Sequence, residues 1–230
     1  MTGRISEIFT SIQGEGIYAG MPMVFVRFSG CNLQCDYCDT PLSRSVVDGQ
    51  IKTVPEIIDS IESEISAAKN VFTISFTGGE PLLYVETISG IIPYFKKRGM
   101  KTYLDTNGTL YENFSKIAED IDCVAMDIKL PSACGLEYWR EHKKFLKAAK
   151  KNTFVKIVVT SKSTDKEFKK AVGIISEVDA SIPLVIQPVT PVKNVDAMPF
   201  ERIRTLKKFA ETKLENVSII PQMHKKLGIR

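Results

Sequence analysis

Apolar and polar positions alternate with two periods along the chain. Short runs rich in β-branched and aromatic residues predict strands, and apolar residues at i, i+3, i+4 and i+7 predict amphipathic helices between them. The predicted strands span 23–28, 71–76, 101–105, 121–129, 153–160, 183–187 and 216–220. Two predicted helices begin at the capping box Thr53–Glu56 and at Pro81. Four more are predicted at 111–120, 135–150, 165–178 and 196–213. This alternation predicts an α/β fold with a parallel sheet.

The chemically distinctive residues follow the carboxyl ends of the predicted strands. These segments are 28–41, 77–81, 105–109, 127–129, 160–162, 187–188 and 222–224. In parallel α/β folds, ligands bind at this edge of the sheet. About six parallel strands are too few to close an eight-stranded barrel. We therefore expect a partial (β/α) barrel with a lateral opening for substrate and an active site at the C-terminal ends of its strands.

Composition narrows the function classes. The chain has 230 residues, of which 43% are hydrophobic and 25% charged, and its net charge of +4 is too small to argue for nucleic acid. The lysines of 143–151 most simply form a solvated helix face, with contact to RNA or to an acidic partner as the alternative. No apolar run approaches the ~20 residues of a membrane span, and no apolar leader opens the chain, so we expect a cytoplasmic protein.

Three of the five cysteines fall on one predicted loop. Cys31, Cys35 and Cys38 have the spacing C-x3-C-x2-C directly after a strand. A structural zinc ion takes four protein ligands, whereas three thiolates on an iron–sulfur cluster would leave one iron open. Cys123 lies in an apolar run typical of a core, and Cys134 remains a candidate fourth ligand. The spacing alone leaves both a zinc knuckle and an open cluster possible.

Two features near the first predicted strand are ambiguous. The glycines at 14, 16 and 20 precede a strand and do not fit a dinucleotide fingerprint. Their loop is either a plain turn or a ligand loop that presents Gln13 and Glu15. Strand alternation places Val24, Val26 and Phe28 on one face and Met23, Phe25 and Arg27 on the other. Arg27 is therefore either a surface group or a clamp for an anion.

The cysteine loop and Gly78-Gly-Glu-Pro81 together resemble the radical S-adenosylmethionine (SAM) core. The resemblance implies that the open iron of a [4Fe-4S] cluster chelates SAM, and that the reduced cluster cleaves SAM to methionine and a 5'-deoxyadenosyl radical. Over essentially its whole length the chain also resembles the 7-carboxy-7-deazaguanine synthase family. The matching segments are Phe9–Gly16, Pro22, Phe25–Arg27, Gly30–Leu33, Cys38–Thr40 and Pro221–Lys225.

This family resemblance implies a lyase. It would convert 6-carboxy-5,6,7,8-tetrahydropterin to 7-carboxy-7-deazaguanine with loss of ammonia, for queuosine or archaeosine in tRNA, and would regenerate SAM each turn. The implied cofactors are a [4Fe-4S] cluster, SAM and Mg2+. The implied partners are an electron donor such as flavodoxin or ferredoxin and a second copy of the chain, without direct nucleic-acid or membrane binding. One radical SAM domain would span 1–230, with a cluster loop at 28–41 and a substrate-side tail at about 216–230.

The resemblance also implies roles for individual residues. Cys31, Cys35 and Cys38 would hold the cluster, and Thr40 would bind Mg2+. SAM would be bound by Tyr37, Cys38, Asp39, Gly78, Gly79, Glu80, Asp127, Ile128, Lys129 and Gln187. The pterin would be bound by Ile12, Gln13, Gly14, Glu15, Arg27, Thr77 and Arg230, with Arg27 on its carboxylate. Three residues depart from what many relatives carry, namely Asp105, Asp127 and Arg230.

Two other functions compete. A radical SAM activase that makes a glycyl radical on a partner protein would share the cysteine spacing, but it would not need the Gln13–Glu15 loop or Arg27. A zinc-binding structural module would not explain Gly78-Gly-Glu-Pro81 at the neighbouring strand end. Failure to turn over the tetrahydropterin would favour the activase, and a colourless protein with about one zinc would favour the module.

Overall fold

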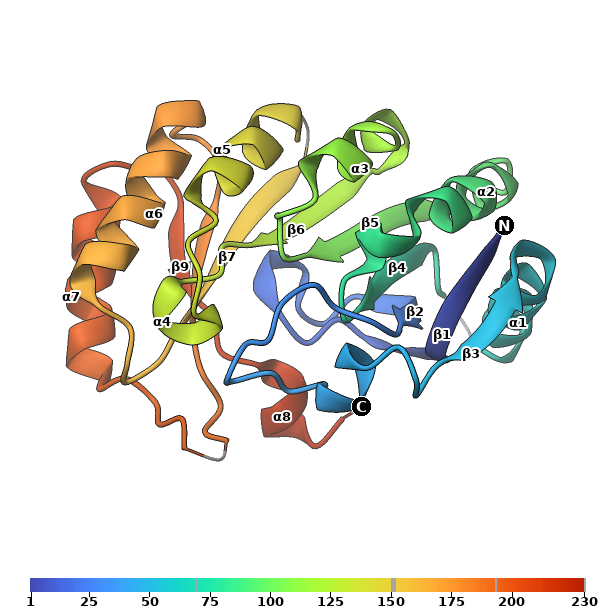
Figure 1. Cartoon of the computed structure of the whole chain (residues 1–230), viewed down its shortest axis with the longest axis horizontal. Coiled ribbons are helices and arrows are strands. Elements are labelled where there is room, and N and C mark those ends of the chain that lie inside the picture. The colour runs from blue at the N-terminus through green and yellow to red at the C-terminus, as the bar shows by residue number, and fades with distance from the viewer. Residues whose placement is uncertain (69, 150–151, 193, 230) are drawn as a thin grey trace.

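A single curved sheet organises the fold (Figure 1). The computed structural model describes residues 1–68, 70–149, 152–192 and 194–229. In this part of the chain the sheet has nine strands, in the order β3-β1-β2-β4-β5-β6-β7-β8-β9. Their bounds are β1 Thr2–Ile12, β2 Pro22–Phe28, β3 Gln50–Thr53, β4 Thr73–Gly78, β5 Lys101–Thr106, β6 Cys123–Asp127, β7 Thr153–Val159, β8 Leu184–Pro188 and β9 Val217–Ile219.

The strands from β2 through β4 to β9 pair in parallel, which confirms the predicted parallel α/β sheet. The antiparallel strands β1 and β3 extend one edge and were not predicted. A register shift between Ile5 and Glu7 explains why β1 was missed. Ile5 packs on the helix side and Phe9 on the opposite side, although strict alternation would place both on one face.

The helices are α1 Val54–Ala67, α2 Val85–Lys96, α3 Tyr111–Ser115, α4 Pro131–Cys134, α5 Trp139–Ala148, α6 Asp165–Val178, α7 Phe200–Glu211 and α8 Met223–Leu227. All of these except α4 and α8 line the outer face of the sheet (Figure 1). The capping box of Thr53 and Glu56 starts α1 as predicted. The helix predicted at 135–150 is observed as α5, which begins later, at Trp139. The short α4 before it was not predicted, and it ends where Gly135 adopts a left-handed conformation. Among the described residues, no helix has the length and apolar character needed to cross a membrane.

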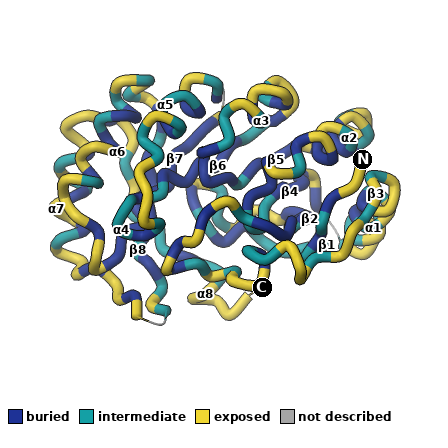
Figure 2. Tube along the Cα trace, viewed as in Figure 1, coloured by how far each residue is buried: buried dark blue, intermediate teal, exposed yellow. Residues whose placement is uncertain are grey.

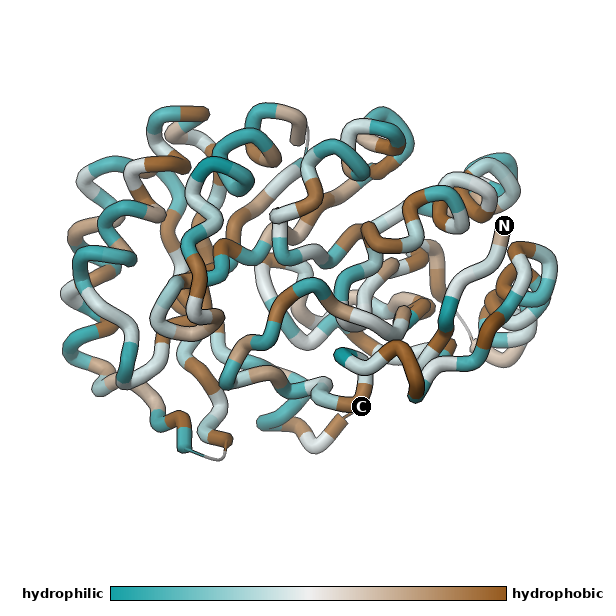
Figure 3. The backbone as a smooth tube through the Cα atoms, viewed as in Figure 1, coloured by the Kyte–Doolittle hydropathy of each residue, from teal (hydrophilic) through white to brown (hydrophobic). Residues whose placement is uncertain are grey.

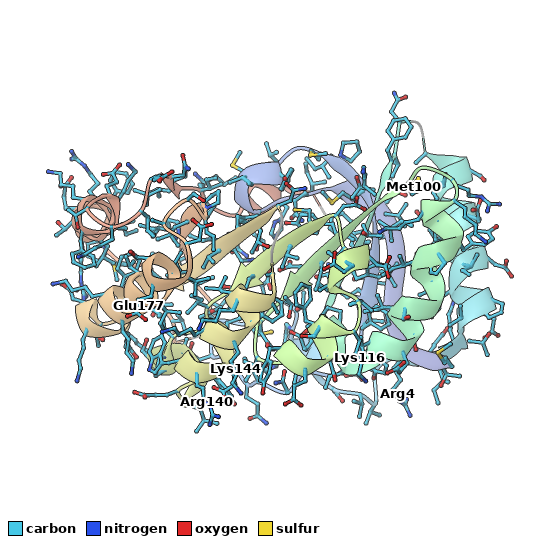
Figure 4. The ribbon with its side chains drawn as sticks, turned by 90° about the horizontal axis from the view of Figure 1, so that it is seen from above. Arg4, Met100, Lys116, Arg140, Lys144 and Glu177 are labelled. Carbon is cyan, nitrogen blue, oxygen red and sulfur yellow. The ribbon has the colours of Figure 1, made fainter. Side chains whose placement is uncertain are left out.

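The lysines of α5 lie on the outside of the fold. Lys143 pairs with Glu177 of α6, and Lys144 donates to the Tyr111 hydroxyl at 2.7 Å. Figure 4 places Lys144 and Glu177 on these outer helices. These contacts support the solvated helix face for the described lysines, whereas residues 150 and 151 lie outside the described residues.

The two faces of the sheet are filled differently. The main core packs the strands against the outer helices, and Figure 2 shows the strands as the buried layer. In Figure 3 these strands carry the hydrophobic colour, whereas hydrophilic segments follow the outer helices. On the concave face, a smaller apolar cluster contains Phe9, Met23, Phe25, Tyr103, Ala125, Phe154 and Val185. As predicted for β2, Val24, Val26 and Phe28 face the helices and Met23 and Phe25 face inward.

The concave apolar cluster stops halfway up the strands. Two residues further along β2, β5, β6, β7 and β8, the inward-facing side chains become polar. These residues are Arg27, Asp105, Asp127, Lys156 and Gln187, and all of them line one pocket. The inner face thus consists of an apolar layer beneath a charged layer at the carboxyl ends of the strands.

Candidate active site

The pocket joins segments that are far apart in the sequence. The cysteine loop, residues 12–15, the ends of β4, β5 and β6, and the C-terminal segment all line it. Figure 1 shows α8 and the C-terminal end beside the loop that follows β2. The lining includes all predicted ligand residues except Glu80, Ile128 and Arg230. Arg230 lies outside the described residues.

The three loop cysteines fit a cluster that needs three thiolates. Cys31, Cys35 and Cys38 are unbridged and line the pocket together. Burial raises the pKa of Cys31 and raises that of Cys35 to about 11. Without a metal the thiols of Cys31 and Cys35 therefore stay protonated, and a cationic metal centre would stabilise both as thiolates.

Neither remaining cysteine completes a four-thiolate set. Cys134 packs beside the loop, but its thiol donates to the carbonyls of Leu130 and Leu136 at 3.4 and 3.3 Å. Cys123 begins β6, at the end of the strand opposite the pocket, and packs against the concave apolar cluster. The donor set thus suits a [4Fe-4S] cluster with one open iron better than a structural zinc ion.

The Gly78–Pro81 turn packs on the entry to the cysteine loop. Gly79 N donates to Phe28 O at 3.0 Å, and Glu80 N donates to Gly30 O at 2.8 Å. A Cβ on Gly78 would collide with the Phe28 backbone, and one on Gly79 with the Gly30 backbone. Glycine is therefore required at both positions, because the two loops meet main chain to main chain.

Glu80 joins these loops rather than facing the pocket. Its fully buried carboxylate accepts from Leu82 N at 3.0 Å, Thr106 Oγ1 at 2.8 Å and Asn107 N at 2.8 Å. Burial raises its pKa to about 7. Ile128 is also fully buried, in the core on the helix side. Neither side chain lies where it can touch a ligand in the pocket.

A buried charge network forms the pocket floor. Lys129 contacts Asp127 at 2.7 Å, and Lys156 lies 3.4 Å from Asp127 and also pairs with Glu15. Burial opposes the charge on Lys156, but Asp127, Glu15 and Asp105 outweigh it and raise its pKa. Burial raises the pKa of Asp105 to about 6. Lys156 was not predicted as a site residue, because in the sequence it is a single polar residue within an apolar strand.

The C-terminal segment closes the opposite wall. Gln222 Nε2 donates to Glu15 Oε1 at 2.7 Å and to Asp39 Oδ2 at 3.1 Å, and Met223 N donates to Gly14 O at 2.8 Å. The His224 ring occupies the space that a Cβ on Gly14 would need. The glycine-rich segment is therefore held in the pocket wall by the C-terminal segment and is not a plain turn.

Glu15, Asp39 and His224 bring three ligand atoms within 4.8 Å of one another. Lys156 donates to Glu15, and Gln222 Nε2 donates to both Glu15 and Asp39, so each of these two carboxylates has a hydrogen-bond donor within the protein. Thr40 is nearby in the pocket lining, with its hydroxyl 3.9 Å from Cys38 Sγ.

Arg27 lines the pocket and pairs with Glu7, and its guanidinium carbon lies 5.0 Å above the Phe9 ring. Its Nε is buried without a hydrogen-bond partner among the described residues. Three more lining groups share this state, namely Tyr37 OH, Asp127 Oδ1 and Gln187 Oε1. Buried polar atoms normally find partners, so these four lining groups are available to a ligand bound in the pocket.

Comparisons with known proteins agree with this geometry. The profile of the radical SAM superfamily matches residues 25–175. The chain is 34% identical to a 7-carboxy-7-deazaguanine synthase from Geobacter sulfurreducens, covering 98% of this chain and 97% of that one. It is 36% identical to one from Methanothermobacter thermautotrophicus, covering 100% and 99%. The crystal structure of QueE from Escherichia coli superposes with a TM-score of 0.68 at 17% identity, covering 97% and 95%. That likeness supports the fold.

Proposed function

Because the chain belongs to the 7-carboxy-7-deazaguanine synthase family of radical SAM enzymes, we propose that it converts 6-carboxy-5,6,7,8-tetrahydropterin to 7-carboxy-7-deazaguanine with loss of ammonia. The observation that carries this proposal is one pocket that unites three unbridged cysteines with Arg27 and the Gln13–Glu15 segment. An activase acting on a partner protein would leave Arg27 and that segment without a role.

Cys31, Cys35 and Cys38 would hold a [4Fe-4S] cluster that, when bound and reduced, supplies the electron for cleavage of SAM to a 5'-deoxyadenosyl radical. Lining residues of the adjacent strand ends would hold SAM. The unpaired oxygens of Asp127 and Gln187 suit the hydroxyl and amino donors of such a ligand. Gly79 would face SAM with its main chain, and Tyr37 and Asp39 would line the cluster side.

The wall formed by residues 12–15 would hold the pterin. The guanidinium of Arg27 matches the shape and charge of the substrate carboxylate. Glu15, held between Lys156 and Gln222, presents an acceptor to the N–H groups of the pterin ring. Gln13 is buried on the same segment, and its Oε1 accepts from Glu15 N at 3.1 Å, which fixes this edge.

Thr40 would contribute its hydroxyl to Mg2+. A single threonine oxygen is a weak ligand, so substrate oxygens and waters must complete the octahedron. The position of Thr40 in the pocket lining, with its hydroxyl 3.9 Å from Cys38 Sγ, supports this assignment. A low-potential one-electron donor such as flavodoxin or ferredoxin would reduce the cluster.

The test is anaerobic turnover. Protein purified without oxygen is assayed for iron and then given dithionite, SAM, Mg2+ and 6-carboxytetrahydropterin. We expect about four irons per chain, formation of 7-carboxy-7-deazaguanine and no net loss of SAM. Protein with a full cluster that cleaves SAM but leaves the pterin unchanged would overturn the proposed substrate.

A further inference from the structure

Asn107 has a side chain whose orientation the structure fixes. It lies on the turn after β5, and its Oδ1 accepts from Thr109 N at 3.1 Å and from Thr109 Oγ1 at 2.6 Å. A backbone N–H can only donate, so the carboxamide oxygen must face Thr109. The Nδ2 group therefore points the opposite way, towards the cysteine loop.

Both hydrogens of Nδ2 meet an acceptor on that loop. The Nδ2 nitrogen lies 2.9 Å from Asn32 Oδ1 and 4.0 Å from Cys31 Sγ, and the second distance is long for a contact to sulfur. Asn32 Nδ2 donates in turn to Thr109 Oγ1 at 2.8 Å, and this closes a ring of three side chains. The ring prevents the Asn107 amide from rotating away from Cys31.

The backbone of Asn107 is held equally firmly. Its N–H donates to buried Glu80, and its carbonyl oxygen lies 3.1 Å from Nε2 of fully buried His142. Burial lowers the pKa of His142 to about 4, so the ring is neutral at physiological pH. A carbonyl only accepts, so the ring proton is on Nε2 and His142 is the donor.

We propose that Asn107 is a positioning residue that donates a hydrogen bond to the Cys31 thiolate and thereby raises the reduction potential of the bound cluster. One-electron reduction by a low-potential donor adds negative charge to the cluster and its sulfur ligands. A donor aimed at one of these sulfurs stabilises the reduced form more than the oxidised form. Cys31 also accepts from Leu33 N at 3.4 Å, but this backbone donor stays in place when Asn107 is changed.

The test compares midpoint potentials in redox titrations monitored by electron paramagnetic resonance (EPR), without pterin. Asn107→Leu keeps the approximate volume and removes the donor. We expect the ratio of reduced to oxidised cluster at a fixed potential to fall roughly tenfold, which is about 59 mV for one electron. Thr109→Val, which loosens the amide but keeps the Thr109 backbone donor, should move the potential in the same direction by less.

Asn113→Leu is the matched control, because Asn113 donates its amide to Leu82 O at 2.9 Å. Its potential should equal that of the wild type. If Asn107→Leu fails to retain iron, Asn107→Ala replaces it, because it lacks the donor and adds no charge beside the cluster. An unchanged potential in an Asn107 variant that holds about four irons would overturn the proposal. Because no pterin is present, this result is independent of the proposed substrate.

Discussion

The apolar layer and the charged layer of the concave face lie on the same strands but have different functions. Phe154 and Lys156 are two residues apart on β7 and point to the same side, as do Phe25 and Arg27 on β2. The lower member of each pair packs in an apolar cluster, whereas the upper member lines the pocket. The step from one layer to the other marks where the interior stops supporting the fold and starts to hold ligands.

Removing a cysteine should have the largest effect and should spare the fold. Cys35→Ala removes one of three cluster ligands, so we expect loss of bound iron and of activity with thermal stability close to that of the metal-free wild type. Cys134→Ala is the matched control, since its thiol donates only to the carbonyls of Leu130 and Leu136. Iron analysis after anaerobic reconstitution checks both variants. A colourless Cys134→Ala protein would contradict the three-ligand assignment.

A change in the apolar layer should act on stability. Phe154→Ala removes a fully buried ring that packs against Gly16 and Tyr18, so we expect a loss of about 3–5 kcal/mol in the free energy of unfolding. Denaturant titration measures it. Iron content per folded chain should stay unchanged, and a variant of wild-type stability would contradict the role assigned to this layer.

The same strand offers the complementary change in the charged layer. Lys156→Met leaves Glu15 without its buried cation, whereas Asp127 retains Lys129. We expect a loss of about 3 kcal/mol in unfolding free energy, at the lower end of the range for a broken buried pair. The KM for the pterin should rise as well. Lys147→Met, at an exposed lysine of α5, is the control and should change neither value. If Lys156→Met left the KM for the pterin unchanged, Lys156 would have no role in binding the substrate.

Replacing Asp105 should change the unfolding free energy by less, and the change should depend on pH. Burial raises its folded-state pKa to about 6, from an ordinary value of 3.8, so the native state holds this proton more tightly than the unfolded state. Its contribution to stability therefore falls as pH rises from about 4 to 6. Asp105→Asn should stabilise the protein by about 1–3 kcal/mol at pH 7.5 and by little at pH 4. Equal effects at both values would show that Asp105 titrates normally.

The sequence predicted the parallel core and most of the lining, because strand periodicity and the position of strand ends are local signals. The Cys31–Cys38 spacing and the Gly78–Pro81 turn are likewise contiguous. The strand β1 escaped prediction because its bulge breaks the alternation between Ile5 and Phe9. Lys156 escaped because its partners, Glu15 and Asp127, come from other parts of the chain.

The hydrogen-bonded group of Asn107, Asn32 and Thr109 was not predicted either, because its members are also distant in the sequence. Asn32 and Thr109 are 77 residues apart, and His142 comes from a third element. The periodicity of the sequence cannot predict such contacts, because Asn, Thr and Gly are also the usual residues of an ordinary turn. Glu80 shows the reverse case. Its motif suggested a ligand contact, whereas the fold uses its carboxylate to join two loops.

The most direct test of the site is the EPR spectrum of the anaerobically reduced protein before and after SAM is added. Three protein thiolates leave one iron free to bind SAM, so we predict a [4Fe-4S] signal that changes shape when SAM binds. A cluster signal that SAM leaves unaltered would contradict the open iron, and a protein that binds zinc and gives no signal would contradict the cluster itself.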